Sequence, residues 1–180
     1  MQSRYFAIVD VILLFLYQMH LMESRGIEFT NINCTTLDKE FCDFEYCYLK
    51  AINRTYKPLS LKVRLYKTPV TKFSINIYFH KRSNGLMPIS HNITVDGCKL
   101  ISEMKNPLVS FLFGMFKAYS NINHACPYDH DIIVDKLPTQ FVYQQFTGLW
   151  IFPEGEYVYD SNWIAYGKNR ANVRVHISYT

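Results

Sequence analysis

Residues 72–81 read Lys-Phe-Ser-Ile-Asn-Ile-Tyr-Phe-His-Lys, and this stretch decides the fold class. Its apolar side chains, Phe73, Ile75, Ile77 and Phe79, alternate strictly with polar or amphipathic ones. Successive side chains of a β-strand point to opposite faces, so this pattern predicts a half-buried strand. Residues 61–66 and 172–179 repeat the same alternation.

Less regular segments extend the β pattern along the chain. They are residues 27–34, 41–52, 91–96, 141–152 and 157–166. Turn residues separate them at Lys57-Pro58, Ser83-Asn84-Gly85 and Pro153-Glu154-Gly155. About eight strands of this length predict a mostly β, two-sheet antiparallel sandwich of the immunoglobulin-like kind.

One segment has helical periodicity instead. Asn106-Pro107 is typical of an N-cap followed by proline at the first helical position. After it, apolar residues recur at steps of three and four through residue 119. We expect one helix near 107–119, with an apolar face that packs on the sandwich.

Residues 1–26 have the three parts of a secretory signal peptide. Arg4 gives a positive start, an apolar run covers residues 8–16, and Ser24-x-Gly26 supplies small residues before a cleavage point. The run is shorter than the roughly 20 residues that span a bilayer. An uncleaved anchor or a buried first helix are the alternatives, and we favour cleavage. Residues 27–180 then form a single secreted domain without a stable membrane span.

Composition agrees with one compact domain. The 180-residue chain is 49% hydrophobic, 16% aromatic and 19% charged, so it has ample apolar surface for a core. Its net charge is only +4, and the largest basic cluster is Lys81-Arg82. Nucleic-acid binding needs a basic face or stripe, so we expect no nucleic-acid partner.

Three glycosylation sequons agree with secretion. They begin at Asn33, Asn53 and Asn92. We expect Asn53 and Asn92 to be the occupied sites, because a disulfide at Cys34 would restrict access to Asn33.

Five cysteines lie after the signal segment. They are Cys34, Cys42, Cys47, Cys98 and Cys126. In a secreted chain most of them should be bridged, and an odd count leaves one over. Two bridges are expected, and spacing alone leaves their connectivity open. No Cys-x-x-Cys pair indicates zinc.

The strongest candidate for chemistry is the cluster His124-x-Cys126-Pro-Tyr-Asp129-His130-Asp131. Its two histidines and two carboxylates suit metal binding or acid–base catalysis. In a strand the two histidines would lie about 20 Å apart. A turn at Cys126-Pro127 would bring them together, yet no third ligand is evident, so we favour a disulfide-anchored corner. With no Gly-x-Ser-x-Gly elbow and no glycine-rich phosphate loop, we expect no enzyme activity, catalytic residue, metal or cofactor.

Several motifs carry a family resemblance. They are Cys34, Phe41, Phe44, Cys47-Tyr-Leu-Lys50, Asn53-Arg54-Thr55, Lys81-Arg82-x-Asn84-Gly85, Asn92-Ile-Thr-Val-Asp96-x-Cys98, Asn106-Pro107, Ser120-Asn121-x-Asn123-His124-x-Cys126-Pro127-Tyr128, Asp129-His130-Asp131 and Phe152-Pro153-x-Gly155-x-Tyr157. Over residues 27–180 the chain resembles a large insect family of secreted domains of unknown function that includes the CheB pheromone-response proteins. That family is placed in the ML lipid-recognition superfamily of ganglioside-activator-like β-sandwiches.

The resemblance implies a pairing of the cysteines. The recurrent cysteines of the family match four here, which implies the bridges Cys34–Cys47 and Cys98–Cys126. Cys42 departs from the family pattern, where a small polar residue is more usual. It is then a free buried thiol, an intermolecular link, or a competitor of Cys34 for Cys47.

The resemblance also implies a non-enzymatic protein that binds a lipid or another hydrophobic small molecule, in chemosensory or pheromone response. The expected cavity residues, which would equally fill an ordinary core, are Phe73, Ile75, Ile77, Phe79, Phe111, Leu112, Met115 and Phe116. The alternative is a secreted glycoprotein without a ligand, which binds an extracellular protein or receptor through exposed aromatics. Its candidate residues are Tyr46, Tyr48, Tyr66 and Tyr78.

Overall fold

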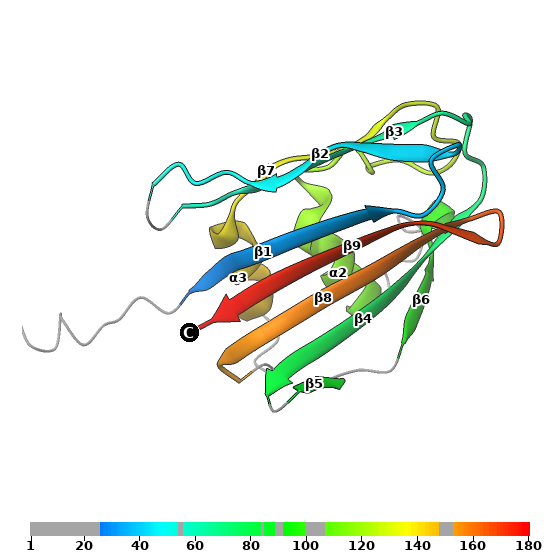
Figure 1. Cartoon of the computed structure of the whole chain (residues 1–180). Helices are drawn as coiled ribbons and strands as arrows, with labels where there is room; N and C mark the ends of the chain where they lie inside the picture. Colours follow the sequence, from blue (N-terminus) through cyan, green and yellow to red (C-terminus); the bar gives the residue numbers. More distant parts are fainter. Residues whose placement is uncertain (1–25, 54–55, 84, 89–91, 100–106, 148–152) are drawn as a thin grey trace, which may run out of the picture.

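Two antiparallel sheets packed face to face form the protein (Figure 1). The computed structural model describes residues 26–53, 56–83, 85–88, 92–99, 107–147 and 153–180. Within these ranges the larger sheet has six strands and the smaller has three. The predicted two-sheet sandwich is therefore confirmed. The signal peptide predicted over residues 1–26 lies almost wholly outside the described residues.

The larger sheet has the order β1-β9-β8-β4-β5, and β6 pairs with β4 on the same edge as β5. Its strands are β1 (Ile27–Thr36), β4 (Phe73–Ser83), β5 (Gly85–Pro88), β6 (Ile93–Asp96), β8 (Gly155–Ala165) and β9 (Lys168–Tyr179).

The smaller sheet has the order β2-β3-β7. Its strands are β2 (Cys42–Leu49), β3 (Leu59–Leu65) and β7 (Ile132–Leu137).

Strand β4 has the burial that its alternation predicts. Ile75, Ile77 and Phe79 are 2%, 4% and 5% exposed. The intervening Ser74, Asn76 and Tyr78 are half-buried on the outer face. The apolar residues face the interior, so the register of the larger sheet is fixed by burial, because a shift of one residue would expose all of them.

A two-residue turn joins β8 to β9. Tyr166 and Gly167 have φ values of 53° and 77°. Two successive positive φ values are those of a type I′ turn, whose twist matches that of the flanking strands. The Thr71 amide donates to the Tyr166 hydroxyl at 3.0 Å, which helps to hold a residue with a Cβ in this conformation.

Helices cover the part of the larger sheet that the smaller sheet leaves open (Figure 1). Helix α2 (Pro107–Lys117) packs against the inner faces of β4 and β6 through Val109, Leu112 and Phe113. Helix α3 (Thr139–Thr147) contacts α2 and β1. No helix within the described residues is long and apolar enough to span a membrane.

Two local predictions were incomplete or wrong. The helix expected near 107–119 is α2, but the strand expected over 141–152 was wrong for residues 141–147, which belong to α3. Val142 is buried, whereas Gln140 and Gln144, two positions away on either side, are exposed. In a strand these three side chains would share one face, so this burial pattern is that of a helix. The aromatic and β-branched residues of the segment favour a strand locally and obscured the helical pattern. Strands β5 and β7 were not expected.

Both disulfides join segments that lie apart in the fold. Cys34–Cys47 links β1 to β2, and thus the larger sheet to the smaller. Cys98–Cys126 links the 3₁₀ turn η1 (Gly97–Lys99) to the segment that follows α2. These are the two pairs that the resemblance implies.

Candidate functional site

A cavity of about 170 Å³ lies between the two sheets. This volume is more than ten times the roughly 10–15 Å³ that one water molecule requires. It is therefore too large to be an ordinary packing defect, since protein interiors leave few voids larger than water. The inward-facing side chains of both sheets form its walls.

The wall from the larger sheet consists mainly of β8 and β9. Strand β9 contributes Val173, Val175 and Ile177, each 8% exposed or less. Strand β8 contributes Tyr159, Ser161 and Trp163. These three β9 residues are aliphatic, whereas each of these three β8 residues carries a polar atom.

The wall from the smaller sheet is mainly aliphatic. Leu59, Leu61 and Val63 of β3 and Val134 of β7 all line the cavity. Two of these residues belong to the alternating pattern that identified the strand at 61–66. The sequence therefore held the signal for this wall, but the pattern could not show which other sheet it would face.

An aromatic cluster forms part of the lining. The ring of Phe73 stacks on Trp163, with 6.1 Å between the centroids, and meets the Tyr128 ring edge-on at 5.7 Å. Gly97 lies directly against Phe73, because a Cβ on Gly97 would come within 2.0 Å of that ring. The absence of a side chain at Gly97 thus allows Phe73 to occupy its place in the wall.

The two helices contribute Met115 and Phe116 from α2 and Val142 from α3 to the lining. The small side chains of the lining belong to the larger sheet, where Ala165 and Ala171 are each 5% exposed. Alanine removes little volume from the space between the sheets, so these two positions help to keep the cavity open.

One charged residue is part of the described lining, and its charge is balanced. The Arg170 guanidinium forms an ion pair with Asp38 and lies 4.3 Å from the centroid of the Phe41 ring. Lys168 also pairs with Asp38, at 2.8 Å. Hydrogen bonds and charges from Lys168 and Arg170 lower the pKa of Asp38 to about 2.

Cys42 is the free cysteine of the described residues, and it is 3% exposed. It lines the cavity, and its thiol donates to the Arg170 carbonyl oxygen at 3.8 Å. Burial, with smaller contributions from Asp38 and Asp43, raises the pKa of Cys42 to about 11. Cys42 is therefore a neutral, buried thiol in the single chain, and Cys34 rather than Cys42 pairs with Cys47.

The eight expected cavity residues divide into three groups. Phe73, Met115 and Phe116 line the cavity. Ile75, Ile77 and Leu112 lie instead around a void of about 10 Å³ between β4 and α2, which Phe116 also lines. Phe79 and Phe111 are buried but line neither space, and Phe79 stacks on Tyr157.

Helix α2 explains this division. Its apolar face fills the space over the middle of β4, so that Ile75 and Ile77 become ordinary core residues. The strand pattern identified inward-facing residues, but it could not show that a helix covers some of them.

The His-Asp cluster folds into a corner. The Nε2 atoms of His124 and His130 lie 2.9 Å apart, and the Tyr128 ring stacks on His124. The chain turns between the histidines, as considered for Cys126-Pro127, so they do not lie far apart as they would in a strand. Among the described residues no group of three or more potential ligands could hold a metal ion.

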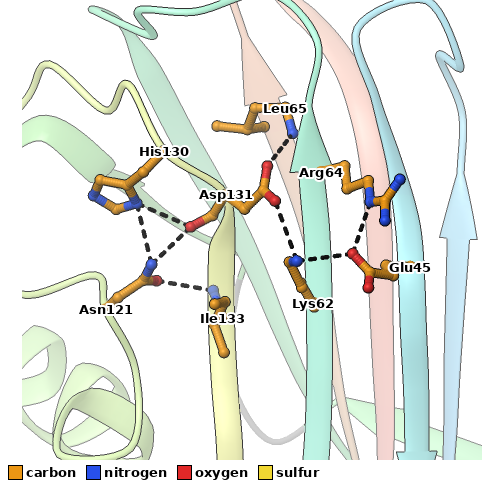
Figure 2. A network of polar contacts seen from close by, with 8 residues as sticks. All are labelled: Glu45, Lys62, Arg64, Leu65, Asn121, His130, Asp131 and Ile133. Carbon is orange, nitrogen blue, oxygen red and sulfur yellow. Dashed lines mark hydrogen bonds and ion pairs between the residues drawn. The ribbon is translucent and has the colours of Figure 1, made fainter.

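Polar contacts connect this corner to the smaller sheet (Figure 2). The Asn121 side chain donates to the Asp131 carbonyl oxygen at 2.7 Å and accepts from the Ile133 amide at 2.8 Å. The Asp131 carboxylate accepts from the Leu65 amide at 3.1 Å and lies 3.4 Å from Lys62. The corner therefore fixes the start of β7 against β3.

The network continues to strand β2 through Glu45 (Figure 2). Arg64 and Lys62 contact the Glu45 carboxylate at 2.7 and 2.8 Å. Their hydrogen bonds and charges, with those of Arg64 the largest, lower the pKa of Glu45 to about 2. All these contacts lie at the surface of the smaller sheet, and they position its strands.

The four tyrosines considered for partner binding are divided between the sheets. Tyr46 and Tyr48 lie on β2 with their ring centroids 5.5 Å apart, and Tyr66 follows β3. Tyr78 lies on β4 of the larger sheet, beside His80. They therefore do not form one continuous patch.

The sequon asparagines Asn33, Asn53 and Asn92 are all exposed. All three side chains are therefore open to modification. Exposure does not distinguish Asn33, next to the bridged Cys34, from the other two, and the occupancy of Asn53 and Asn92 stays a prediction.

The fold and the cavity together define a disulfide-linked β-sandwich with an apolar cavity between its sheets. Residues 73–159 match the model of a family described as "Protein of unknown function (DUF1091)". The matched residues run from the start of β4 into β8 and include Phe73, Cys98, Cys126 and Tyr159. The chain is thus similar to that family over the part that contains both helices. A comparison with curated proteins finds no match.

Proposed function

We propose that this protein is secreted and binds a lipid or another hydrophobic small molecule in the cavity between its sheets. The observation that carries the proposal is a cavity of about 170 Å³ with an almost entirely apolar lining. Apolar ligand sites are lined in this way, with a few placed polar groups. Each Å² of apolar ligand surface removed from water there contributes roughly 25 cal/mol to binding.

Three features support a location outside the cell. The disulfides Cys34–Cys47 and Cys98–Cys126 are of the kind that persists in oxidising compartments. The sequon asparagines are exposed, as glycosylation requires. The sequence of residues 1–26 has the features of a secretory signal. A chemosensory or pheromone-response role is the finer proposal, and the family resemblance supports it.

Binding without catalysis is the proposed activity. The described lining contains no histidine or carboxylate that would act as a general base. The Cys42 thiol is neutral because burial raises its pKa to about 11. The Ser161 hydroxyl donates its proton to the Val173 carbonyl oxygen at 3.1 Å. The nucleophilic groups of the lining are therefore not activated.

The proposal is tested with protein secreted from a eukaryotic host. We expect mass spectrometry of an organic extract to detect a lipid or other apolar molecule. We also expect the stripped protein to bind the neutral fluorophore N-phenylnaphthylamine with a saturable blue-shifted emission. An empty extract together with no saturable fluorescence would contradict the proposal.

A second measurement distinguishes ligand binding from the alternative, binding of a protein partner. Tyr66 is 54% exposed, and its replacement in Tyr66→Ala leaves the cavity untouched. A ligand-binding protein should retain its fluorophore affinity in Tyr66→Ala and in Tyr78→Ala. Loss of an extracellular partner in these variants, with the extract empty, would favour the alternative.

A further inference from the structure

The described lining of the cavity contains one residue with a charged side chain, Arg170. It lies near the start of β9, at the end of the sandwich where β1 connects to β2 and β8 turns into β9 (Figure 1). No other lysine or arginine, and no histidine, aspartate or glutamate, is part of that described lining. How the cavity receives a charged ligand therefore depends on whether the Arg170 guanidinium is available to it.

Contacts within the protein already occupy this guanidinium. Its Nε donates to the Ala165 carbonyl oxygen at 3.2 Å, and its Nη1 donates to the Asp38 carboxylate. The central carbon of the guanidinium lies 4.3 Å from the centroid of the Phe41 ring, which covers one of its flat faces. The side chains of Arg170 and Asp38 are 15% and 9% exposed, so the charge of Arg170 is balanced by an enclosed partner.

Backbone contacts hold Asp38 beside Arg170. The Arg170 carbonyl oxygen accepts from the Leu37 and Asp38 amides at 2.8 and 3.2 Å. Lys168 lies 2.8 Å from the same carboxylate, but it is 62% exposed and does not line the cavity, so water solvates its charge. The carboxylate of Asp38 is therefore in place at Arg170 before any ligand binds.

We propose that the Asp38–Arg170 pair makes the cavity select neutral apolar molecules and reject carboxylates such as fatty-acid anions. This inference rests on the proposed function and adds a ligand class to it. A carboxylate among apolar walls needs a cationic partner, and arginine is the residue best suited to that role.

A carboxylate ligand would find that role of Arg170 already taken by Asp38. It would either remain unpaired or leave Asp38 without its partner in an enclosed position, and each of these outcomes is strongly unfavourable. A neutral ester or hydrocarbon needs no cationic partner, so it leaves the ion pair intact.

The test compares decanoate with its methyl ester at neutral pH, by displacement of N-phenylnaphthylamine. The wild-type protein should bind the ester roughly a hundredfold more tightly, because a buried charge without a partner costs at least that much affinity. Asp38→Asn removes the competing carboxylate and makes Arg170 available. It should bind decanoate at least about tenfold more tightly than the wild type does, with its affinity for the ester unchanged.

Asp160→Asn is the matched control. It changes the net charge by the same amount, and it breaks an ion pair with Arg174 in which neither residue lines the cavity. This variant should keep the wild-type preference for the ester. A gain in decanoate affinity equal to that of Asp38→Asn would show that net charge, and not the pair at the cavity, decides the preference.

Two further outcomes would overturn the inference while the proposed function stands. One is equal binding of decanoate and its ester by the wild type, a comparison that needs no variant. The other is an unchanged affinity for decanoate in Asp38→Asn protein that still binds the ester. If the wild type binds neither probe and no fluorophore, the proposed function itself fails.

Discussion

Filling the cavity from Ala171 should stabilise the protein and weaken ligand binding. Ala171 lines the cavity and is 5% exposed, and Ala171→Leu adds three carbon atoms at the wall. Burial of each carbon contributes about 0.8 kcal/mol, or about 2.4 kcal/mol in all. The loss of leucine rotamer freedom subtracts about 0.5–1 kcal/mol. We therefore expect a gain of about 1.4–1.9 kcal/mol in the free energy of unfolding.

The assay is urea unfolding of stripped protein, followed by tryptophan fluorescence, together with titration of N-phenylnaphthylamine. Val95→Phe is the control, because Val95 is 2% exposed and borders only the void of about 10 Å³. Enlarging a packed position of this kind should cost about 1–3 kcal/mol. The fluorophore should bind Ala171→Leu more weakly than the wild type. If Ala171→Leu destabilises the protein as much as Val95→Phe does, the space beside Ala171 is already filled and the cavity is not there.

Three further predictions follow from the charges and cysteines. Asp38→Asn should be less stable than wild type above pH 4, and the difference in stability should narrow between about pH 4 and 2. The reason is that the folded-state pKa of Asp38 is about 2, against an ordinary 3.8. A stability difference that does not depend on pH in acid unfolding curves would contradict this. Replacing Cys98 and Cys126 by alanine should lower the free energy of unfolding by about 3.5 kcal/mol in the chain-entropy model, because the bridge spans a sequence separation of 28. Calorimetry or urea unfolding would measure this loss of stability. A loss below about 1 kcal/mol would show that loop closure is not the main effect of the bridge. Cys42 should resist iodoacetamide at pH 8 in the native protein and react in denaturant, since it is buried and its pKa is raised to about 11; rapid native labelling detected by mass spectrometry would refute its burial.

The sequence predicted the strands whose two faces differ. In β4 the alternation of residues 73–79 identifies the buried face, because one face meets the core and the other meets solvent. The segment at 141–147 was mistaken because Phe141, Val142 and Tyr143 favour strands locally, whereas the fold places them in a helix beside α2 and β1. Local preference is a weak guide when tertiary contacts decide burial.

The candidate site was predicted only in part. Phe73, Met115 and Phe116 were recognised as apolar and inward-facing, and they line the cavity. The cavity-lining residues of β8 were missed, although Tyr159 and Ser161 lie in a predicted strand, because Ser161 interrupts an otherwise bulky face. A small polar residue on the inner face of a strand is the signal that would have drawn attention to them.

By itself, the sequence determined the class of the fold, the approximate positions of most strands and of one helix, and an odd number of cysteines. These properties are local, because the period of a strand or helix and the composition of a turn are fixed within a few residues. Only the tertiary structure decided that α2 covers Ile75 and Ile77 while β3 and β9 remain apart around a cavity. It also brought the imidazoles of His124 and His130 into contact. The physical reason is that a cavity depends on how distant segments pack, and side chains of the same apolar pattern either fill the space between two sheets or surround it.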